Sequence, residues 1–120
     1  MKNPVATLPA NHFKAGLAEK RRQPGLWVTL ESANATEVVA GSGFDWLLLD
    51  MEHTSLDVSQ VADHIRAAKG GTAELVVRVP WNDAVVMERL PDTGLRSFMI
   101  PLLQSAEETR SGRRHAAVGP

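Results

Sequence analysis

Three polar residues with catalytic side chains follow an apolar run near the middle of the chain. The run of residues 46–49 ends at Asp50, and Glu52 and His53 lie within the next three positions. A short apolar run of this kind is typical of a strand buried in a parallel sheet. In α/β proteins, ligands and reacting groups gather at the carboxyl ends of such strands. The pattern therefore predicts a functional site where this strand ends.

A second apolar run, residues 75–79, carries one charged residue, Arg78. A guanidinium fork can donate two parallel hydrogen bonds to a carboxylate or an enolate. Burying an arginine without a partner costs several kcal/mol, so Arg78 needs a bound anion or, in the structural alternative, a pair with Asp50 or Glu52. Histidine accepts and returns protons near neutral pH, so His53 is the candidate for proton transfer; its structural alternative is a loop residue that caps the strand. Together these residues predict an active site for an anionic substrate.

Strands and helices must alternate if these two runs are to lie side by side. The expected strands are residues 26–30, 44–50, 75–80 and 97–101. The expected helices are one capped by Asn11, residues 34–40, one from Ser55 or Asp57 to about 69, residues 83–90, and residues 106 to about 110. This alternation with short connections predicts βαβ units and a parallel sheet, an α/β fold. Residues 111–120 lose the pattern and are expected to be an irregular tail after a domain of residues 1–110.

The composition limits the class of protein. The chain has 120 residues, 43% of them hydrophobic, which is enough for one domain with a real core. A balance of 13 basic and 14 acidic residues gives a net charge of −1, which predicts no general affinity for nucleic acid or anionic membranes. No segment approaches the roughly 18 apolar residues of a membrane span, and the start lacks the apolar stretch of a signal peptide. With no cysteine, a soluble cytoplasmic protein is expected.

Several segments of the chain resemble the HpcH/HpaI aldolase family. They are residues 13–15, 24–27, 40–53, 76–83 and 100–108, in unbroken order. Asp-x-Glu-His after a buried strand, together with a later Arg-x-x-Trp-Asn-Asp, is specific for that family. The resemblance implies a (β/α)₈ TIM barrel of roughly 250 residues, of which this chain holds the N-terminal half: an N-terminal helix and about four βα units. It also implies a metal-dependent class II aldolase that cleaves 4-hydroxy-2-oxo acids to pyruvate and an aldehyde.

The resemblance further assigns roles to individual residues. His53 matches a histidine that moves protons through a water, and Asp92 matches the aspartate partnered with it. Arg78 matches the arginine that holds the enolate oxygen of pyruvate. The matches to residues around the substrate are Trp27, Asp50 and Glu52.

Simpler interpretations stand beside these roles. Asp92 is also compatible with a turn residue before Gly94, and Trp27 with packing at the end of the barrel. A direct metal-binding role for the two carboxylates at 50 and 52 is less favoured, because the family's ligands lie elsewhere. The remaining histidines are expected to be solvated bystanders: His12, His64 and His115.

The chain also departs from the family pattern. Met51 stands where glycine is frequent, and Pro91 stands where a helix-forming leucine is usual and could deform the approach to Asp92. The glutamate and aspartate that bind the family's divalent metal, Mg²⁺ or Mn²⁺, have no match among these 120 residues. No residue of this chain is therefore expected to be a metal ligand.

Half a barrel leaves two open sheet edges and an exposed apolar inner face. We therefore expect either association into a homo-oligomer that closes the sheet or low stability with aggregation. Little activity is expected from the chain alone, because the metal ligands are missing. A truncated or frame-shifted copy of a longer aldolase is one explanation of the tail. The alternative function is a non-catalytic fragment that self-associates or pairs with a full-length aldolase subunit. A related lyase acting on a CoA thioester is a third, less favoured possibility.

Overall fold

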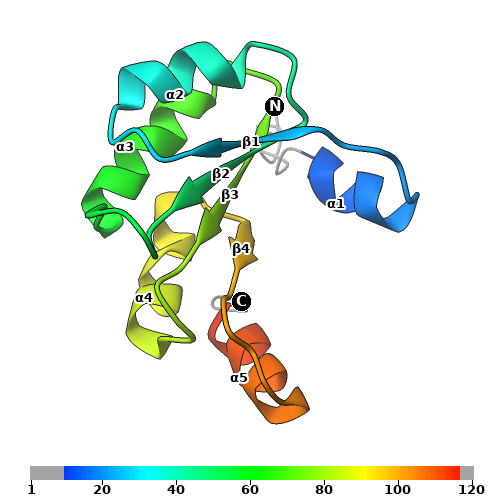
Figure 1. Cartoon of the computed structure of the whole chain (residues 1–120), viewed down its shortest axis with the longest axis vertical. Helices are drawn as coiled ribbons and strands as arrows, with labels where there is room; N and C mark the ends of the chain where they lie inside the picture. Colours follow the sequence, from blue (N-terminus) through cyan, green and yellow to red (C-terminus); the bar gives the residue numbers. More distant parts are fainter. Residues whose placement is uncertain (1–9, 117–120) are drawn as a thin grey trace, which may run out of the picture.

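Four parallel strands form the centre of the structure, a computed structural model that describes residues 10–116 (Figure 1). The strands lie in the order β1-β2-β3-β4, and a helix connects each one to the next. This arrangement confirms the predicted α/β fold. In chain order the elements are α1 (His12–Ala18), β1 (Gly25–Val28), α2 (Ala33–Ala40), β2 (Trp46–Asp50), α3 (Val58–Ala68), β3 (Glu74–Arg78), α4 (Ala84–Arg89), the 3₁₀ turn η1 (Pro91–Thr93), β4 (Ser97–Met99) and α5 (Ala106–Ala116).

Side-chain caps set the starts of the helices. Asp57, rather than Ser55, caps α3, and it forms a reciprocal capping box with Gln60. A side-chain cap satisfies backbone N–H groups that have no partner inside the helix. The caps that accept a hydrogen bond from the first turn are Asn11, Ser32, Asp57 and Asp83.

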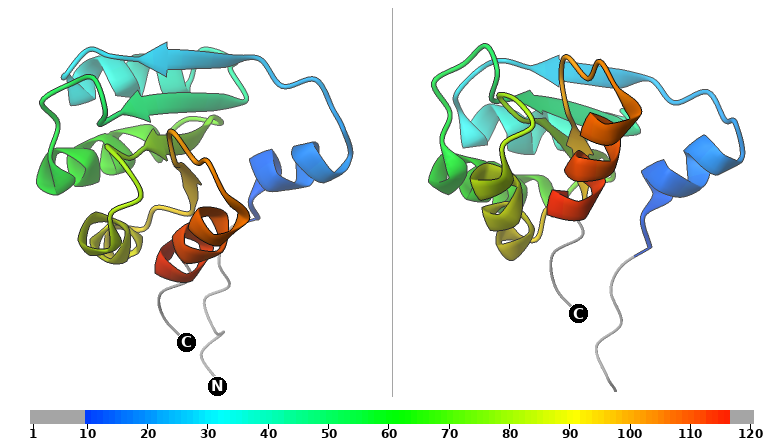
Figure 2. Two further views of the ribbon diagram at one scale, coloured as in Figure 1. Left: turned by 60° about the horizontal axis from the view of Figure 1, so that its bottom comes forward. Right: turned by 90° about the horizontal axis from the view of Figure 1, so that it is seen from below.

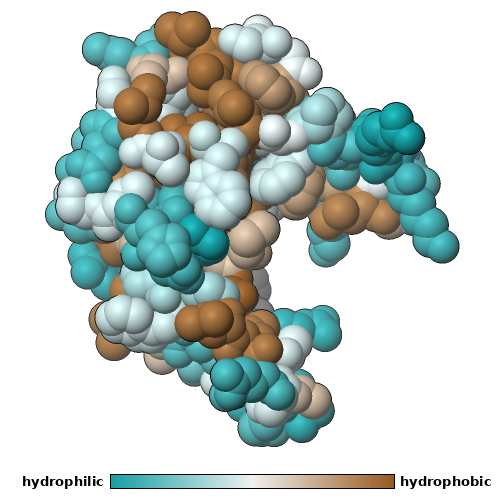
Figure 3. All heavy atoms as spheres, viewed as in Figure 1, coloured by the Kyte–Doolittle hydropathy of each residue, from teal (hydrophilic) through white to brown (hydrophobic). Residues whose placement is uncertain are grey.

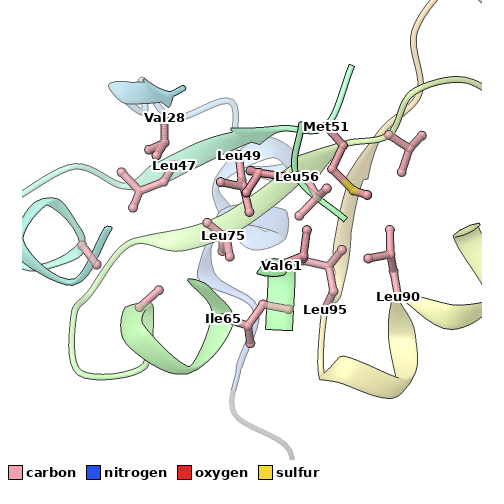
Figure 4. Packing of buried hydrophobic residues seen from close by; sticks show 14 of the residues in the cluster. Val28, Leu47, Leu49, Met51, Leu56, Val61, Ile65, Leu75, Leu90 and Leu95 are labelled. Atoms are coloured by element: carbon pink, nitrogen blue, oxygen red, sulfur yellow. The ribbon is translucent and has the colours of Figure 1, made fainter. Parts of the chain in front are cut away.

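The hydrophobic core lies between the sheet and the helices α2, α3 and α4. Figure 4 shows Leu47 and Leu49 of β2 and Leu75 of β3 directed toward Val61 and Ile65 of α3. Each such buried side chain contributes about 1.5–3 kcal/mol. Successive side chains of a strand alternate between the two faces of the sheet. Because Leu47, Leu49 and Leu75 face the helices, the residues that alternate with them along β2 and β3 face the opposite side.

Helix α1 lies beyond the ends at which the strands begin (Figure 2). The rings of Phe13 in α1 and Trp46, the first residue of β2, are 5.3 Å apart. The Asn11 side chain donates a hydrogen bond to Ser97, the first residue of β4. Helix α1 therefore lies at the end of the sheet where the strands begin. The predicted site lies at the opposite end, where the strands finish, which we call the carboxyl edge.

Helix α5 extends to Ala116, so the prediction of an irregular tail was wrong for residues 111–116. Ion pairs of Glu107 with Arg110 and Arg114, at 3.0 and 3.3 Å, support the helix. Gly112 allows close packing, because an added Cβ there would lie 2.5 Å from Cδ1 of Ile100. Residues 117–120 lie outside the described part of the chain. Among residues 10–116, no helix has both the length and the apolar composition that a membrane crossing requires.

His64 is buried between α2 and α3, which contradicts its predicted exposure to solvent. Its Nδ1 lies 2.6 Å from the hydroxyl of Thr36, and both side chains are buried. The helical spacing offered a signal: His64 follows Val61 by three positions and precedes Ala68 by four, so all three share the face of α3 that packs on the core.

Stability is expected to fall as the pH is lowered past about 6.5. Burial lowers the pKa of His64 below its ordinary value of 6.5, although the charge of Asp63 acts in the other direction. The unfolded chain therefore binds the proton at a higher pH than the folded chain does, and acid favours unfolding. Thermal melts between about pH 8 and pH 5 should show a smaller decrease of Tm in His64→Gln than in the unchanged chain. His12→Gln, at an exposed position, is the control; equal pH dependence in all three proteins would contradict the prediction.

Candidate active site

Three neighbouring strands bring Trp27, Asp50 and Arg78 together at the carboxyl edge of the sheet. Asp50 and Arg78 end β2 and β3 and are directly opposite in the register. The guanidinium donates to both carboxylate oxygens, with Nη2 2.7 Å from Oδ2 and Nε 3.2 Å from Oδ1. Trp27, on β1, donates from Nε1 to Oδ2 at 3.2 Å, and its ring lies 4.5 Å from Cζ of Arg78. The three side chains therefore form one cluster across the sheet.

Asp50 also organises the turn that follows β2. Its Oδ1 accepts hydrogen bonds from the backbone N–H groups of Glu52 and His53, at 2.8 and 3.2 Å. The hydroxyl of Thr54 donates to the carbonyl of Asp50. Sequence analysis did not single out Thr54, although a threonine shortly after a strand often closes a turn in this way. The positions of Glu52 and His53 thus depend on one buried carboxylate.

The Asp50 carboxylate is saturated with hydrogen-bond donors. It is 1% exposed, and both oxygens accept hydrogen bonds from the side chains or backbone of its neighbours. Burial by itself would raise the pKa of Asp50, but the hydrogen bonds from Arg78, the turn and Trp27 outweigh burial and hold the pKa at about 2. This geometry favours a positioning role for Asp50 over the substrate contact that the resemblance implies.

Arg78 keeps one end of its guanidinium directed away from Asp50. The hydrogen bonds to Asp50 raise the pKa of Arg78, with the charges of Asp50 and Glu52 acting in the same direction. Its Nη1 lies 3.9 Å from Oε1 of Glu52. Because Asp50 occupies the Nε edge, Nη1 is the part of Arg78 that is best placed to meet a ligand oxygen.

Glu52 lies between the arginine and the histidine. Its Oε1 is 2.7 Å from Nε2 of His53, whose side chain is 69% exposed. Its second oxygen, Oε2, is buried without a hydrogen-bond partner among the described residues. The predicted meeting of His53 and Arg78 at one edge of the sheet is therefore present, with Glu52 between them.

Asp92 is not brought to this cluster. It is exposed and lies in η1, in the connection that leads into the start of β4. In a parallel sheet, residues before a strand lie at the opposite edge from residues after a strand. Pro91 starts η1, and Gly94 ends the turn with a φ of 94°. The structure thus matches the turn interpretation of Asp92, and no contact between Asp92 and His53 forms within the chain.

The described residues do not make a complete metal site. Among residues 10–116 there is no group of three or more His, Asp or Glu side chains arranged to hold a metal ion. Asp50 is fully engaged, and the Glu52–His53 pair offers one buried carboxylate oxygen. A divalent metal would therefore need ligands from outside this part of the chain.

The cluster opens to solvent instead of lining an enclosed cavity. Trp27 is 53% exposed at its edge. A hollow of about 320 Å³ lies elsewhere, between α3 and the residues that begin β3 and β4; its lining includes Ile65, Lys69, Leu75 and Leu95. The predicted site residues Asp50, Glu52, His53 and Arg78 therefore lie at the open carboxyl edge and not in this hollow.

Four parallel βα units with an arginine, carboxylates and an imidazole at the carboxyl ends of adjacent strands correspond to one half of a (β/α)₈ barrel, the fold in which functional residues gather at that end. The family model described as HpcH/HpaI aldolase/citrate lyase matches residues 23–114. The chain belongs to this family, as the sequence resemblance predicted.

Similar proteins support the assignment. A 4-hydroxy-2-oxo-heptane-1,7-dioate aldolase of Shigella sonnei is 41% identical over 110 residues, which are 92% of this chain and 42% of the relative. A 5-keto-4-deoxy-D-glucarate aldolase of Escherichia coli is 45% identical over 98 residues, or 82% of this chain and 38% of the relative. The crystal structure of an HpcH/HpaI aldolase/citrate lyase family protein from Burkholderia cenocepacia superposes with a TM-score of 0.84 at 35% identity, covering 88% of this chain and 42% of the other. The chain thus spans about two fifths of the length of these relatives.

Proposed function

We propose that this chain carries the pyruvate-holding part of the active site of a carbon–carbon lyase that cleaves 4-hydroxy-2-oxo acids. The observation that supports this most is Arg78, fixed in orientation by Asp50 and Trp27 beside the Glu52–His53 pair. Two aldolases among the relatives act, by their names, on hydroxylated oxo acids or on a keto sugar acid. A small 2-oxo acid is therefore the proposed substrate, and pyruvate and an aldehyde are the proposed products.

The reaction requires proton transfer and the stabilisation of negative charge. A base removes the proton of the C4 hydroxyl, the C3–C4 bond breaks, the aldehyde leaves, and the bond electrons form the enolate of pyruvate. His53 is the proposed proton carrier: it takes up the hydroxyl proton and returns a proton to C3 of the enolate, which gives pyruvate. The Nη1 end of Arg78 places fixed positive charge where the enolate oxygen develops. The family resemblance implies a Mg²⁺ or Mn²⁺ ion as a further source of positive charge, but the described residues do not supply its site.

A graft tests the proposal. Residues 23–114 replace the matching part of the Shigella sonnei aldolase, and pyruvate release from a 4-hydroxy-2-oxo acid is followed in a coupled assay with Mg²⁺ or Mn²⁺. We expect the graft to release pyruvate and the 120-residue chain alone to show little turnover, because residues 10–116 do not supply a complete metal site. A graft that folds but releases no pyruvate would contradict the proposed function.

A second candidate is an interaction role, in which the open sheet pairs with another copy. Outer strands β1 and β4 each have one unpaired edge within the described residues. Apolar side chains are exposed over α2 and beside α5 on the face seen in Figure 3. The large exposed apolar residues include Trp27, Leu30, Val38, Trp81 and Leu102.

Self-association is the expected outcome for the purified chain. Size-exclusion chromatography with light scattering should give a mass above the 13.0 kDa of one copy. Leu30→Lys should reduce association, because Leu30 follows the outer strand β1 and is exposed. Glu88→Lys is the control, because Glu88 is exposed on helix α4 and not on an outer strand. A stable monomer at all concentrations would rule out the pairing role.

A further inference from the structure

A carboxylate in the loop after β1 is hydrogen-bonded to the turn that carries His53. Oε1 of Glu31 accepts two hydrogen bonds from Ser55, one from the backbone N–H at 2.7 Å and one from the hydroxyl at 2.6 Å. The contact joins two residues that are 24 positions apart in the chain. We infer that Glu31 is a positioning residue, whose carboxylate restrains the turn that carries His53. The inference deepens the proposed function, which assigns proton transfer to His53.

The sheet brings this loop and this turn side by side. β1 and β2 are parallel neighbours, so the segments that follow them leave the same edge of the sheet (Figure 1). Trp27 of β1 donates to Asp50, where the turn begins. Glu31 contacts Ser55, which lies two residues beyond His53. β1 and the loop after it therefore hold the turn on both sides of the histidine.

The position of His53 depends on the backbone of this turn. Residues 51–57 form neither helix nor strand, and the side chain of His53 is 69% exposed, so little packing restrains it. Asp50 accepts the backbone N–H of His53 at 3.2 Å, and Asp57 caps α3 after the turn. Ser55 does not cap α3; instead its hydroxyl and its backbone N–H both donate to Glu31. Glu31 thus restrains the stretch between these two fixed points.

The charge of Glu31 strengthens the contact. The hydroxyl of Ser55 and then its backbone N–H lower the pKa of Glu31, against the opposing effect of burial. Glu31 is therefore ionised at neutral pH, and hydrogen bonds to an ionised acceptor are about twice as strong as neutral ones. Both residues are exposed, so water competes with these bonds. We therefore expect their loss to loosen the turn and to leave the rest of the fold unchanged.

Hydrogen exchange followed by mass spectrometry tests the inference without any need for turnover. In the 120-residue chain, Glu31→Ala should speed exchange in peptides that cover residues 51–57 about threefold to tenfold, with no change in β2 or β3. Glu31→Gln should cause a smaller change, because its carbonyl still accepts hydrogen bonds. Ser55→Thr keeps the hydroxyl and should exchange more slowly than Ser55→Ala.

Glu108→Ala is the matched control. Oε2 of Glu108 accepts the backbone N–H of Gln104 at 2.7 Å, so this carboxylate also holds a loop, but the loop follows β4. Its removal should leave exchange in residues 51–57 unchanged. If Glu31→Ala had no effect on these residues, or no greater effect than Glu108→Ala, the inference would be overturned.

The graft of residues 23–114 separates this inference from the proposed function. Glu31→Ala should lower kcat about threefold to tenfold with little change in KM, because a poorly placed proton carrier slows proton transfer and not binding. Glu31→Gln should recover part of the lost kcat. An unchanged kcat in Glu31→Ala would overturn the inference. If the unchanged graft releases no pyruvate, the proposed function fails, and the exchange measurement alone decides whether Glu31 positions the turn.

Discussion

Replacing Arg78 by methionine is expected to lower the free energy of unfolding by about 3 kcal/mol. The change leaves the Asp50 carboxylate, which is 1% exposed, without the two hydrogen bonds from the guanidinium. Methionine keeps most of the apolar stem of arginine, so the loss is assigned to the charge and its hydrogen bonds. Urea unfolding followed by circular dichroism gives the difference from the unchanged chain.

Two further variants make this measurement specific. Arg66→Met removes the partner of Asp63 in an exposed pair on α3 and should cost less than about 1 kcal/mol. Adding Asp50→Leu to Arg78→Met removes both charges, so the double variant should regain part of the lost stability. If Arg78→Met costs no more than Arg66→Met, the Asp50–Arg78 pair is solvated and does not organise the site.

The pH dependence of the same variant follows from the pKa of Asp50. The folded chain holds this pKa at about 2, below its ordinary value of 3.8, so the carboxylate contributes stability above pH 3.8 that is lost as the pH falls toward 2. Protonated Asp50 needs no cationic partner. The difference in stability between Arg78→Met and the unchanged chain should therefore shrink as the pH falls through this range.

Strand β2 could be predicted from the sequence, because its run of apolar residues is the pattern expected of a strand that is buried on both faces. Four buried residues, Leu47 to Asp50, follow the only partly buried Trp46 in β2, as expected for a strand covered on both faces. Arg78 could be placed beside Asp50 because parallel strands end at the same edge and a buried guanidinium needs an anion. Strand ends differ from the prediction by one or two residues, since a single sequence does not specify where pairing stops.

The partner of His53 could not be predicted from spacing. The family resemblance pairs His53 with Asp92, which lies in η1 before β4, so that pairing stays a prediction. Glu52 was noticed as a neighbour in sequence, yet adjacent residues after a strand often point apart. Only the hydrogen bonds of the turn to Asp50 show that Glu52 and His53 come together.

In the graft of residues 23–114 into the Shigella sonnei aldolase, Arg78→Met is expected to lower kcat/KM by about 10²–10³-fold. The guanidinium is oriented before substrate binds, by Asp50 on its Nε edge and by the ring of Trp27 at 4.5 Å, so its charge acts without reorganisation. Arg78→Lys should recover little of this loss. A lysine ammonium cannot donate to both oxygens of Asp50 and also hold a fixed donor toward the enolate.

Trp27→Phe tests, in the same graft, how far the orientation of Arg78 depends on Trp27. It keeps an aromatic face for the guanidinium but removes the N–H that donates to Asp50 at 3.2 Å. We expect kcat/KM to fall about tenfold, which is a smaller loss than that of Arg78→Met. Pyruvate release measured over a range of substrate concentrations separates the effects on kcat and KM. If Arg78→Met raised KM alone and left kcat unchanged, the arginine would bind the ground state only, and its proposed role at the enolate would be wrong.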